Sequence, residues 1–433
     1  MTSKTKTPEA KEACNPALVP KLRFPGFDKP WSYDPLSKTL KEHKIKNTAG
    51  RDVFSVSMEY GIVNQIELLG RSFAAANTSH YTIGRQFDVV YTKSPLKAFP
   101  FGIVKQCKFD GEVALSPLYG VFTPPNPHLG LMIEAYFESP SRSKDFLSPL
   151  CQKGAKNTLQ ITNTTFLTGR LPLPTQPAEQ QRIAECLSSV DDLITAQSRK
   201  VDALKAHKKG LIQQLFPCEG ETQPRLRFPE FQGAEEWDEV DFSDVIFFQE
   251  GPGIMAVDFR DEGVPLVRLS GLAGQSVSLI GCNYLEPDKV EEKWSHFRLE
   301  AGDIVVSCSA SFGRPAIVTD AAVGAVFYTG LIRFRAKDRR LDVGYLEVFL
   351  GSPCFLRQAE SAAVGGGIKH FGPTHLRQMK VPLPRPDEQQ RIANCLSYLD
   401  DLISAQVQKH EALKVHKKGL MQQLFPSPAE VEL

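Results

Sequence analysis

A duplicated segment is the strongest constraint on how this chain folds. Residues 179–217 and 388–426 align without a gap and share 29 of 39 positions, which chance does not produce. Shorter matches precede them: LRFPGF at 22–27 corresponds to LRFPEF at 226–231, and a tryptophan follows each, Trp31 and Trp237. Between these matches the two copies share almost no sequence. Such repetition predicts one structural unit built twice around two divergent inserts.

Each 39-residue copy is predicted to form one long helix. A proline-rich stretch precedes both copies, and proline suits the first turn of a helix. Apolar residues then recur at intervals of three and four, as in a coiled-coil heptad. This predicted coiled-coil seam comprises Ile183, Leu187, Val190, Ile194, Val201, Leu204 and Leu211 in the first copy, and Ile392, Leu396, Leu399, Ile403, Leu413 and Leu420 in the second.

Polar residues interrupt the seam at matching places, Gln197 with Gln406 and Lys208 with Lys417. Such residues fix register and partner at some cost in stability. No other long heptad pattern occurs, so we expect the two copies to pack on each other, antiparallel. The alternative is two separate helices, each buried on its own domain. The basic ends at 205–210 and 414–419 fit either a solvated helix face or contact with DNA or a partner.

The inserts, residues 32–170 and 238–380, have sequence patterns typical of α+β domains. Short β-branched and aromatic runs alternate with turns, and a helical stretch comes late in each, at 129–137 and 343–359. We therefore predict a twisted, mostly antiparallel sheet in each insert. The predicted fold class is α+β: two α/β domains joined by two long helices packed as an antiparallel coiled coil, with a pseudo-two-fold internal repeat.

Charge distribution permits DNA contact but argues against a free-standing basic binder. The net charge is +1, while residues 38–110 hold eleven Lys or Arg against six Asp or Glu. Loop residues offer donors suited to phosphates, guanine and adenine, although each taken singly fits an ordinary exposed residue. The predicted DNA-binding candidates are Lys44, Asn47, Thr48, Arg51, Lys93, Ser94, Lys97 and Lys105, and Arg268, Ser270, Ser307, Ser309, Arg314 and His370. Lys156 and Lys369 join them because each follows a glycine by two residues, where the backbone can approach a phosphate.

Several function classes lack their motifs. The nine cysteines include no C-x-x-C pair, which makes zinc and a disulfide framework unexpected. We find no glycine-rich cofactor loop with an Asn/Asp-Pro-Pro-Tyr/Phe tetrad, no spaced acidic nuclease ligands and no Walker loop. We thus expect no catalytic residue, metal or cofactor. No apolar signal core or 18-residue apolar run occurs, so we expect a cytoplasmic protein without a membrane partner.

The chain resembles the specificity subunit of type I restriction-modification enzymes. The resemblance rests on the paired PLP…EQQRIA…DDLI…KKGL-QQLF segments, the LRFP-x-F…W openings, and the closing Gly-x-Lys…PLP of each insert. It implies two target recognition domains, each binding one half of a split double-stranded DNA site, with the helices setting the gap. It also implies two methyltransferase (modification) subunits and restriction (motor) subunits as partners, which supply the catalysis.

On this basis the predicted domains are a disordered tail (1–20), target recognition domain 1 (21–170), conserved helical region 1 (171–217), target recognition domain 2 (218–380), conserved helical region 2 (381–426) and a C-terminal tail (427–433). Three alternatives stay open. They are the specificity component of a fused methylase-nuclease system, an enzyme with unrecognised motifs, and a structural coiled-coil scaffold without a DNA role.

Overall fold

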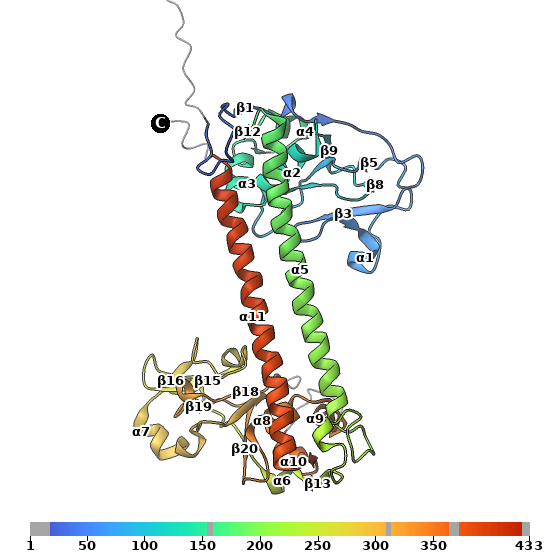
Figure 1. Ribbon diagram of the computed structural model, residues 1–433. Helices are drawn as coiled ribbons and strands as arrows, with labels where there is room; N and C mark the ends of the chain where they lie inside the picture. The colour runs from blue at the N-terminus through green and yellow to red at the C-terminus, as the bar shows by residue number, and fades with distance from the viewer. Residues whose placement is uncertain (1–17, 154–158, 309–312, 363–371, 427–433) are drawn as a thin grey trace, which may run out of the picture. The chain divides into compact units, whose positions relative to one another are not determined.

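The computed structural model describes residues 18–153, 159–308, 313–362 and 372–426. The chain divides into two compact units (Figure 1). Unit 1 comprises Met1–Ser198 and Gln408–Leu433, and unit 2 comprises Arg199–Val407. Because these boundaries fall inside the two long helices, each unit contains one part of each helix.

Unit 1 is built on two four-stranded sheets. The sheet β2-β9-β6-β7 is antiparallel, whereas β4-β3-β8-β5 contains one parallel pair, β3 with β8. The strands are β1 Ser32–Pro35, β2 Lys41–Glu42, β3 Val53–Ser57, β4 Gly61–Asn64, β5 Thr82–Arg85, β6 Val89–Thr92, β7 Ile103–Gln106, β8 Glu112–Leu115, β9 Gly120–Thr123, β10 Gln152–Lys153, β11 Leu159–Gln160 and β12 Arg170–Leu173. The short helices are α1 Gln65–Leu69, α2 Pro127–Phe137, α3 Pro140–Leu147 and α4 Asn163–Thr168.

The helix α2 fills the core of unit 1. Its start is set by Pro127 in the first turn and by Asn126, whose side chain accepts a hydrogen bond from the Leu129 amide at 2.9 Å. The helix is apolar nearly all round and buried, as expected for a helix enclosed by other elements. It packs with Tyr91 and Phe166, whose rings stack at 4.6 Å, and with the ends of both long helices.

Unit 2 repeats this arrangement with different loops. The sheet β14-β20-β17-β18 is antiparallel, and β16-β15-β19 again contains one parallel pair, β15 with β19. The strands are β13 Asp238–Asp241, β14 Ile246–Glu250, β15 Val264–Val267, β16 Asn283–Leu285, β17 Ile304–Ser307, β18 Ala316–Ile317, β19 Val326–Phe327, β20 Leu331–Ala336 and β21 Lys380–Leu383. The short helices are α6 Phe242–Val245, α7 Pro287–Lys289, α8 Val343–Leu350, α9 Pro353–Ala362 and α10 Pro373–Leu376.

The two long helices are α5 Pro177–Leu215 and α11 Pro386–Leu424, each of 39 residues. In unit 1 the Lys417 ammonium, near the end of α11, lies 2.7 Å from the Asp191 carboxylate near the start of α5. In unit 2 Lys208, near the end of α5, contacts Asp400 near the start of α11. The helices therefore pair antiparallel in each unit (Figure 1), and the alternative of separate helices is wrong.

The predicted seam residues are all buried or half-buried. The lysines that interrupt the seam form the ion pairs that fix the register. Lys208 of α5 pairs with Asp400 of α11, and the equivalent Lys417 of α11 pairs with Asp191 of α5. The α+β class and the internal repeat are thus confirmed. Of the predicted N-terminal tail the structure describes Leu18 onward, and Leu18 is buried in the core of unit 1. The rest of that tail, and the C-terminal tail 427–433, lie outside the described residues.

One closing junction holds each unit together, and its residues come from the repeated motifs. In unit 1 the Arg23 guanidinium donates to both oxygens of Glu179, at 2.7 and 2.9 Å. The Trp31 indole donates to the same carboxylate at 3.1 Å and meets the Phe425 ring edge-on at 6.3 Å. Strands β1 and β12 pair beside this cluster and close the domain on the helix start.

Unit 2 has the same junction. The Arg227 guanidinium donates to both oxygens of Glu388, at 2.8 and 2.7 Å, and Trp237 meets the Phe216 ring edge-on at 6.3 Å. Strands β13 and β21 pair as β1 and β12 do. The Trp237 indole nitrogen differs from its counterpart, since it is buried without a hydrogen-bond partner among the described residues. Each LRFP arginine is therefore matched to an EQQR glutamate.

Candidate nucleic-acid interface

Two lysines gather at one sheet edge of unit 1. Strands β2 and β6 both run antiparallel to β9, so their carboxyl ends meet at the same edge. Lys44 follows β2, with its ammonium 3.5 Å from Glu42, and Lys93 follows β6. Burial lowers the pKa of Lys93, Lys44 lowers it further and Glu42 opposes both. Two exposed cations near a single carboxylate form a site that suits a phosphate.

The loop after β2 presents a second set of candidates. The Asn47 carbonyl accepts the Arg51 amide at 2.7 Å, and its amide nitrogen donates to the Arg51 carbonyl at 3.2 Å. This buried side chain thus shapes the loop and leaves Thr48 and Arg51 exposed. The Arg51 guanidinium lies 3.3 Å from Glu112. Ser94 and Lys97 are exposed in the loop after β6.

Three predicted DNA contacts are corrected by their burial. Asn47 serves its own loop, as described above. Lys105 is 4% exposed in β7, with its ammonium 3.2 Å from Glu134 and 3.1 Å from Glu138. Ser307 is 6% exposed in β17. Side chains enclosed in this way do not reach a DNA groove.

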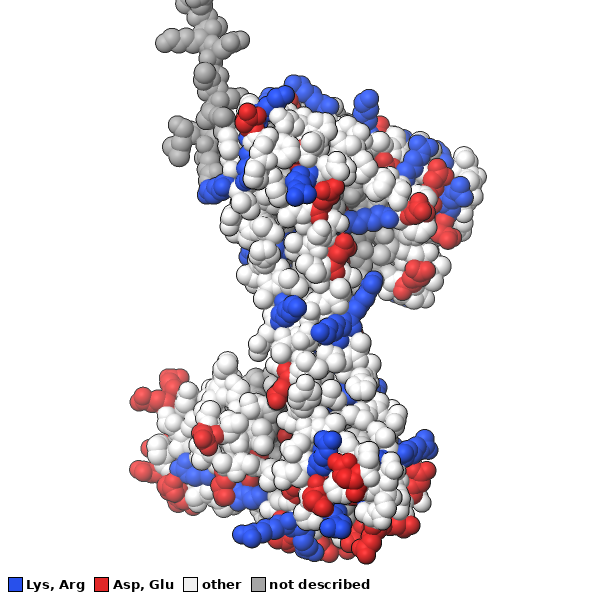
Figure 2. Space-filling view, in the orientation of Figure 1, with Lys and Arg blue, Asp and Glu red and all other residues white. Residues whose placement is uncertain are grey.

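In unit 2 the remaining candidates separate. Arg268 and Ser270 are exposed in the segment that follows β15. Arg314 is exposed too, but its guanidinium lies 3.3 Å from Asp400 on α11. Ser309, Lys156, Lys369 and His370 lie outside the described residues. On the face drawn in Figure 2, Lys and Arg lie among Asp and Glu on each unit.

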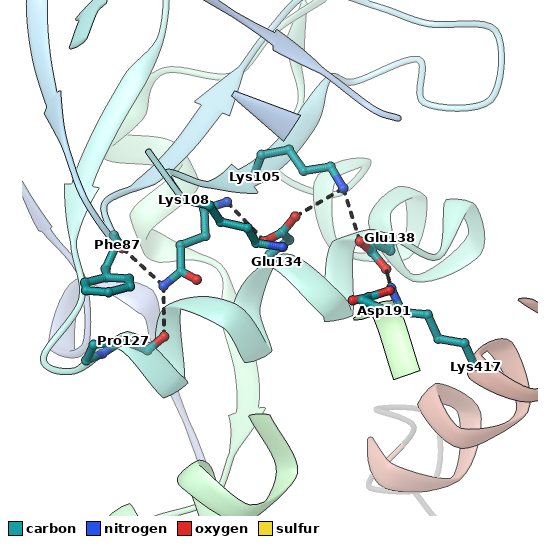
Figure 3. Close-up of polar contacts among 9 residues, drawn as sticks. Phe87, Lys105, Lys108, Pro127, Glu134, Glu138, Asp191 and Lys417 are labelled. Atoms are coloured by element: carbon teal, nitrogen blue, oxygen red, sulfur yellow. Dashed lines mark hydrogen bonds and ion pairs between the residues drawn. The ribbon is translucent and has the colours of Figure 1, made fainter. Parts of the chain in front are cut away.

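A chain of charges joins the inner part of unit 1 to both long helices (Figure 3). Lys105 bridges Glu134 and Glu138 on the α2 side, and Lys417 bridges Glu138, at 2.5 Å, and Asp191. Burial opposes ionisation of Glu138, but the two ammonium groups outweigh it and hold the pKa of this carboxyl below its usual value. The network therefore fixes the variable domain on the helix pair.

In unit 2 the corresponding contact is simpler. Asp400 accepts from Lys208 on α5 and from Arg314 of the variable domain. Glu347 on α8 lies near this group, and burial together with Asp400 raises the pKa of its carboxyl. In both units an ion pair between the helices thus extends into the domain that the helices carry.

The comparisons with known proteins concern these same elements. Residues 234–415 match the family model described as the type I restriction modification DNA specificity domain. Two relatives from Methanocaldococcus jannaschii match a larger part of the chain. The type I restriction enzyme MjaVIII specificity subunit is 26% identical over 287 residues, which cover 63% of this chain and 65% of that protein. The putative type I restriction enzyme MjaX specificity subunit is 25% identical over 292 residues, or 65% of this chain and 64% of that protein.

The chain is thus similar to type I restriction-modification specificity subunits, and the family model matches the part of it that holds the second variable domain. Its match spans slightly less than two thirds of the length of the two curated relatives. A solved S subunit of a type I system from M. genitalium shares the fold, with a TM-score of 0.55 and 15% identity over 94% of this chain and 99% of that one. A chain from a study of type I R-M complex assembly has the same TM-score and identity over 92% and 98%.

The matched residues end inside α11 and include the unit 2 variable domain, with Trp237 and Glu388 of its junction but not Arg227. Unit 1 repeats the arginine–glutamate pair, the edge-on aromatic contact and the strand pair of that junction, and adds a hydrogen bond from the Trp31 indole. Among the described residues, no cluster of three or more His, Cys, Asp or Glu could hold a metal ion. In the same ranges, no helix combines the length and the hydropathy needed to cross a membrane.

Two features of the chain are not predicted from its sequence. The first is the pairing of the arginine of each LRFP motif with the glutamate of an EQQR motif. The signal was present, because both charged residues recur in both copies. The contact of Arg268 with Tyr328 carries no such signal, since Tyr328 is far from it in sequence and approaches it through the pairing of β15 with β19.

The charge network of Figure 3 predicts a pH-dependent effect of Glu138→Gln. A carboxyl whose pKa is lowered by folding stabilises the protein above its unfolded pKa, about 4.5, and loses this contribution as the pH falls through its folded value. We expect the variant to lower the free energy of unfolding of unit 1 by about 1–3 kcal/mol at pH 7. The difference from the parent shrinks below pH 4.5.

Hydrogen-exchange mass spectrometry of β6 and β9 at pH 7 and at pH 3.5, corrected for the intrinsic exchange rate at each pH, measures this difference in unit 1. Glu59→Gln, an exposed glutamate after β3, is the matched control and should change little at either pH. A Glu138→Gln deficit of the same size at both pH values would contradict the assignment.

Proposed function

We propose that this chain is the DNA-reading component of a type I restriction-modification system and binds a bipartite double-stranded site. The variable domain of each unit contacts one half of that site. One observation carries the proposal: junctions that share their arginine–glutamate pair and their strand pair hold domains whose exposed side chains differ. Unit 1 exposes the Lys44–Lys93 pair, whereas unit 2 exposes Arg268 beside aromatic rings. The same scaffold with different exposed groups is what two different target sequences require.

The exposed surface of the helices supports two copies of one partner. Repeat positions such as Asp192 and Asp401, or Lys205 and Lys414, are identical and exposed in both helices. A protein that binds one of these surfaces can therefore bind the equivalent surface on the other helix with a second copy of itself. By the family resemblance these partners are two methyltransferase subunits, joined by restriction subunits. We assign the catalysis to these partner subunits, so that this chain itself is non-catalytic. We propose in addition that the chain is cytoplasmic.

The near-neutral charge supports dependence on these partners for affinity, because phosphate contacts dominate DNA binding. Exposed lysines at the β2–β6 edge contribute some of those contacts. Replacing Lys44 and Lys93 together is expected to weaken binding of all DNA sequences evenly. It should also reduce the slope of log affinity against log salt by about 2, since each phosphate contact contributes about 0.9.

Selection from random DNA duplexes tests the proposal with the full-length chain, alone and assembled with methyltransferase subunits. The proposal predicts two required blocks of sequence separated by a fixed number of unspecified base pairs. Lys44→Ala/Lys93→Ala should select the same bases with lower affinity, and Lys38→Ala, an exposed lysine paired with Asp34, serves as control. Recovery of random sequence by the parent complex would support a structural scaffold instead. Turnover of S-adenosylmethionine by the isolated chain would support an enzyme.

A further inference from the structure

Arg268 lies at the surface of unit 2 against two aromatic rings. Its guanidinium lies over the Phe259 ring at 5.8 Å and over the Tyr328 ring at 5.6 Å from the centroids. These two rings contact each other edge-on at 6.2 Å. One terminal nitrogen donates to the Asn283 side-chain oxygen at 3.0 Å. Two aromatic faces and one amide acceptor therefore orient an exposed cation.

Neighbouring arginines of the same domain are used differently. Arg260 lies 3.5 Å from Glu286, Arg298 contacts Glu291, and Arg335 lies 2.6 Å from Asp303. These guanidinium groups are neutralised by carboxylates within the fold. Within the described ranges, no ion pair to a carboxylate is found for Arg268. Its charge and its remaining N–H groups are thus available to a ligand.

The surroundings of Arg268 favour a base rather than a phosphate. A phosphate contact requires only a nearby cation, whereas contact with a base edge requires a guanidinium fixed in direction. Two exposed apolar side chains are close in sequence: Leu269, next to Arg268, is 64% exposed, and Val257, two residues before Phe259, is 74% exposed. Exposed apolar groups gain little from a phosphate but pack against a thymine methyl in the major groove.

Unit 1 has a different residue at the equivalent place. The parallel pairs place Phe54 opposite Leu115 in unit 1 and Val267 opposite Phe327 in unit 2. The next residues are Ser55 and Arg268. The Ser55 hydroxyl accepts a hydrogen bond from the Gln65 side chain at 3.1 Å. One position of a shared sheet therefore carries an arginine in one unit only.

We infer that Arg268 contacts a guanine in the half-site bound by unit 2, donating two hydrogen bonds to its O6 and N7 atoms. Asn283, Phe259 and Tyr328 act as positioning residues that fix the guanidinium plane. This inference rests on the proposed function, and it adds which base the residue recognises and in which half of the site. Lysine at this position keeps the charge but lacks the two parallel donors.

Binding-site selection by the assembled complex tests the inference with Arg268→Ala and Arg268→Lys. Both variants are expected to lose the requirement for one guanine in one block and to keep every other base. Preference for that guanine should fall by about 5- to 150-fold, the size of one bidentate base contact. Arg339→Ala removes an equal charge from an exposed position after β20 and should leave the selected sequence unchanged.

The outcomes separate the inference from the proposed function. If the parent selects no sequence, the proposed function fails. If the parent selects a bipartite site and both Arg268 variants select it unchanged, the inference alone is overturned. An evenly weakened Arg268→Ala with a smaller salt slope also overturns it, because that result identifies a phosphate contact. Circular dichroism melting confirms folding, and Arg268→Lys keeps the test valid if the alanine variant unfolds.

Discussion

Replacing Glu388 with alanine is expected to lower the free energy of unfolding of unit 2 by about 3–5 kcal/mol, because it removes one partner of a buried ion pair. The Glu388 side chain is 1% exposed, and that of Arg227 is 7% exposed. The carboxylate accepts two hydrogen bonds from the guanidinium, at 2.7 and 2.8 Å. Without it, a buried arginine is left with only the backbone carbonyls of Ala234 and Glu235.

The same substitution at Glu179 should act on unit 1. Glu179 accepts from two nitrogens of Arg23 and from the Trp31 indole, so its loss removes three hydrogen bonds and leaves Arg23 with the Lys29 backbone carbonyl. Hydrogen-exchange mass spectrometry is the appropriate measurement, because a protein of two units does not unfold in one step. Glu388→Ala should raise exchange in β17 and β20, and Glu179→Ala should raise it in β6 and β9.

A matched control is Lys38→Ala, which breaks an exposed ion pair with Asp34 and is expected to cost less than about 1 kcal/mol. If Glu388→Ala left exchange in β17 and β20 as slow as in the control, the junction would not be a stabilising element. Equal acceleration in both units by either single variant would show that the junctions do not act separately.

The sequence alone was sufficient to predict the two long helices and their pairing, because the chain has two copies of one heptad pattern and no other long heptad pattern for either to pack against. It also predicted α+β inserts, and the late helical stretches correspond to α2 and to α8 with α9. The break between α8 and α9 was not predicted, although Pro353 marks it. Proline favours a first helical turn and removes a donor from a helix interior.

Side-chain burial was the main limit for the candidate site. Lys105 lies in β7, where all four residues are buried, whereas a lysine in a short segment of this kind is expected from sequence to be exposed. Glu134 and Glu138, which neutralise it, come from a helix more than twenty residues later. The contact of Arg268 with Tyr328 similarly depends on strand pairing. Periodicity indicates which face is buried, but it does not identify which charges meet.

Replacing the first variable domain with a second copy of the other one has the largest expected effect on function. Residues 242–379, which lie between β13 and β21, can replace residues 36–169, which lie between β1 and β12. Both strand pairs of the junction stay in place. The helix residues that hold the domains are the same in both repeats, Asp191 with Asp400 and Lys417 with Lys208. The chimera therefore has two copies of the second variable domain on compatible helices.

The chimera should lose the first half-site and require the second half-site twice. Several mismatched base pairs, at about 1–3 kcal/mol each, should reduce its affinity for the original site to the non-specific level. The reciprocal exchange, with residues 36–169 in both places, is the matched control and should require the first half-site twice. Neither chimera changes the coiled-coil seam, so the length of the unspecified gap should stay constant.

The most direct test is the DNA sequence that the chimera with residues 242–379 in both places selects from a random duplex library. The chimera is assembled with the same subunits as the parent. This selection shows whether two separate domains on one repeated scaffold each recognise one half of the site. We expect two blocks with identical base requirements, both matching the block that the parent assigns to unit 2. If the chimera folds and still selects the parent's two different blocks, the recognition of each half by a separate unit is contradicted.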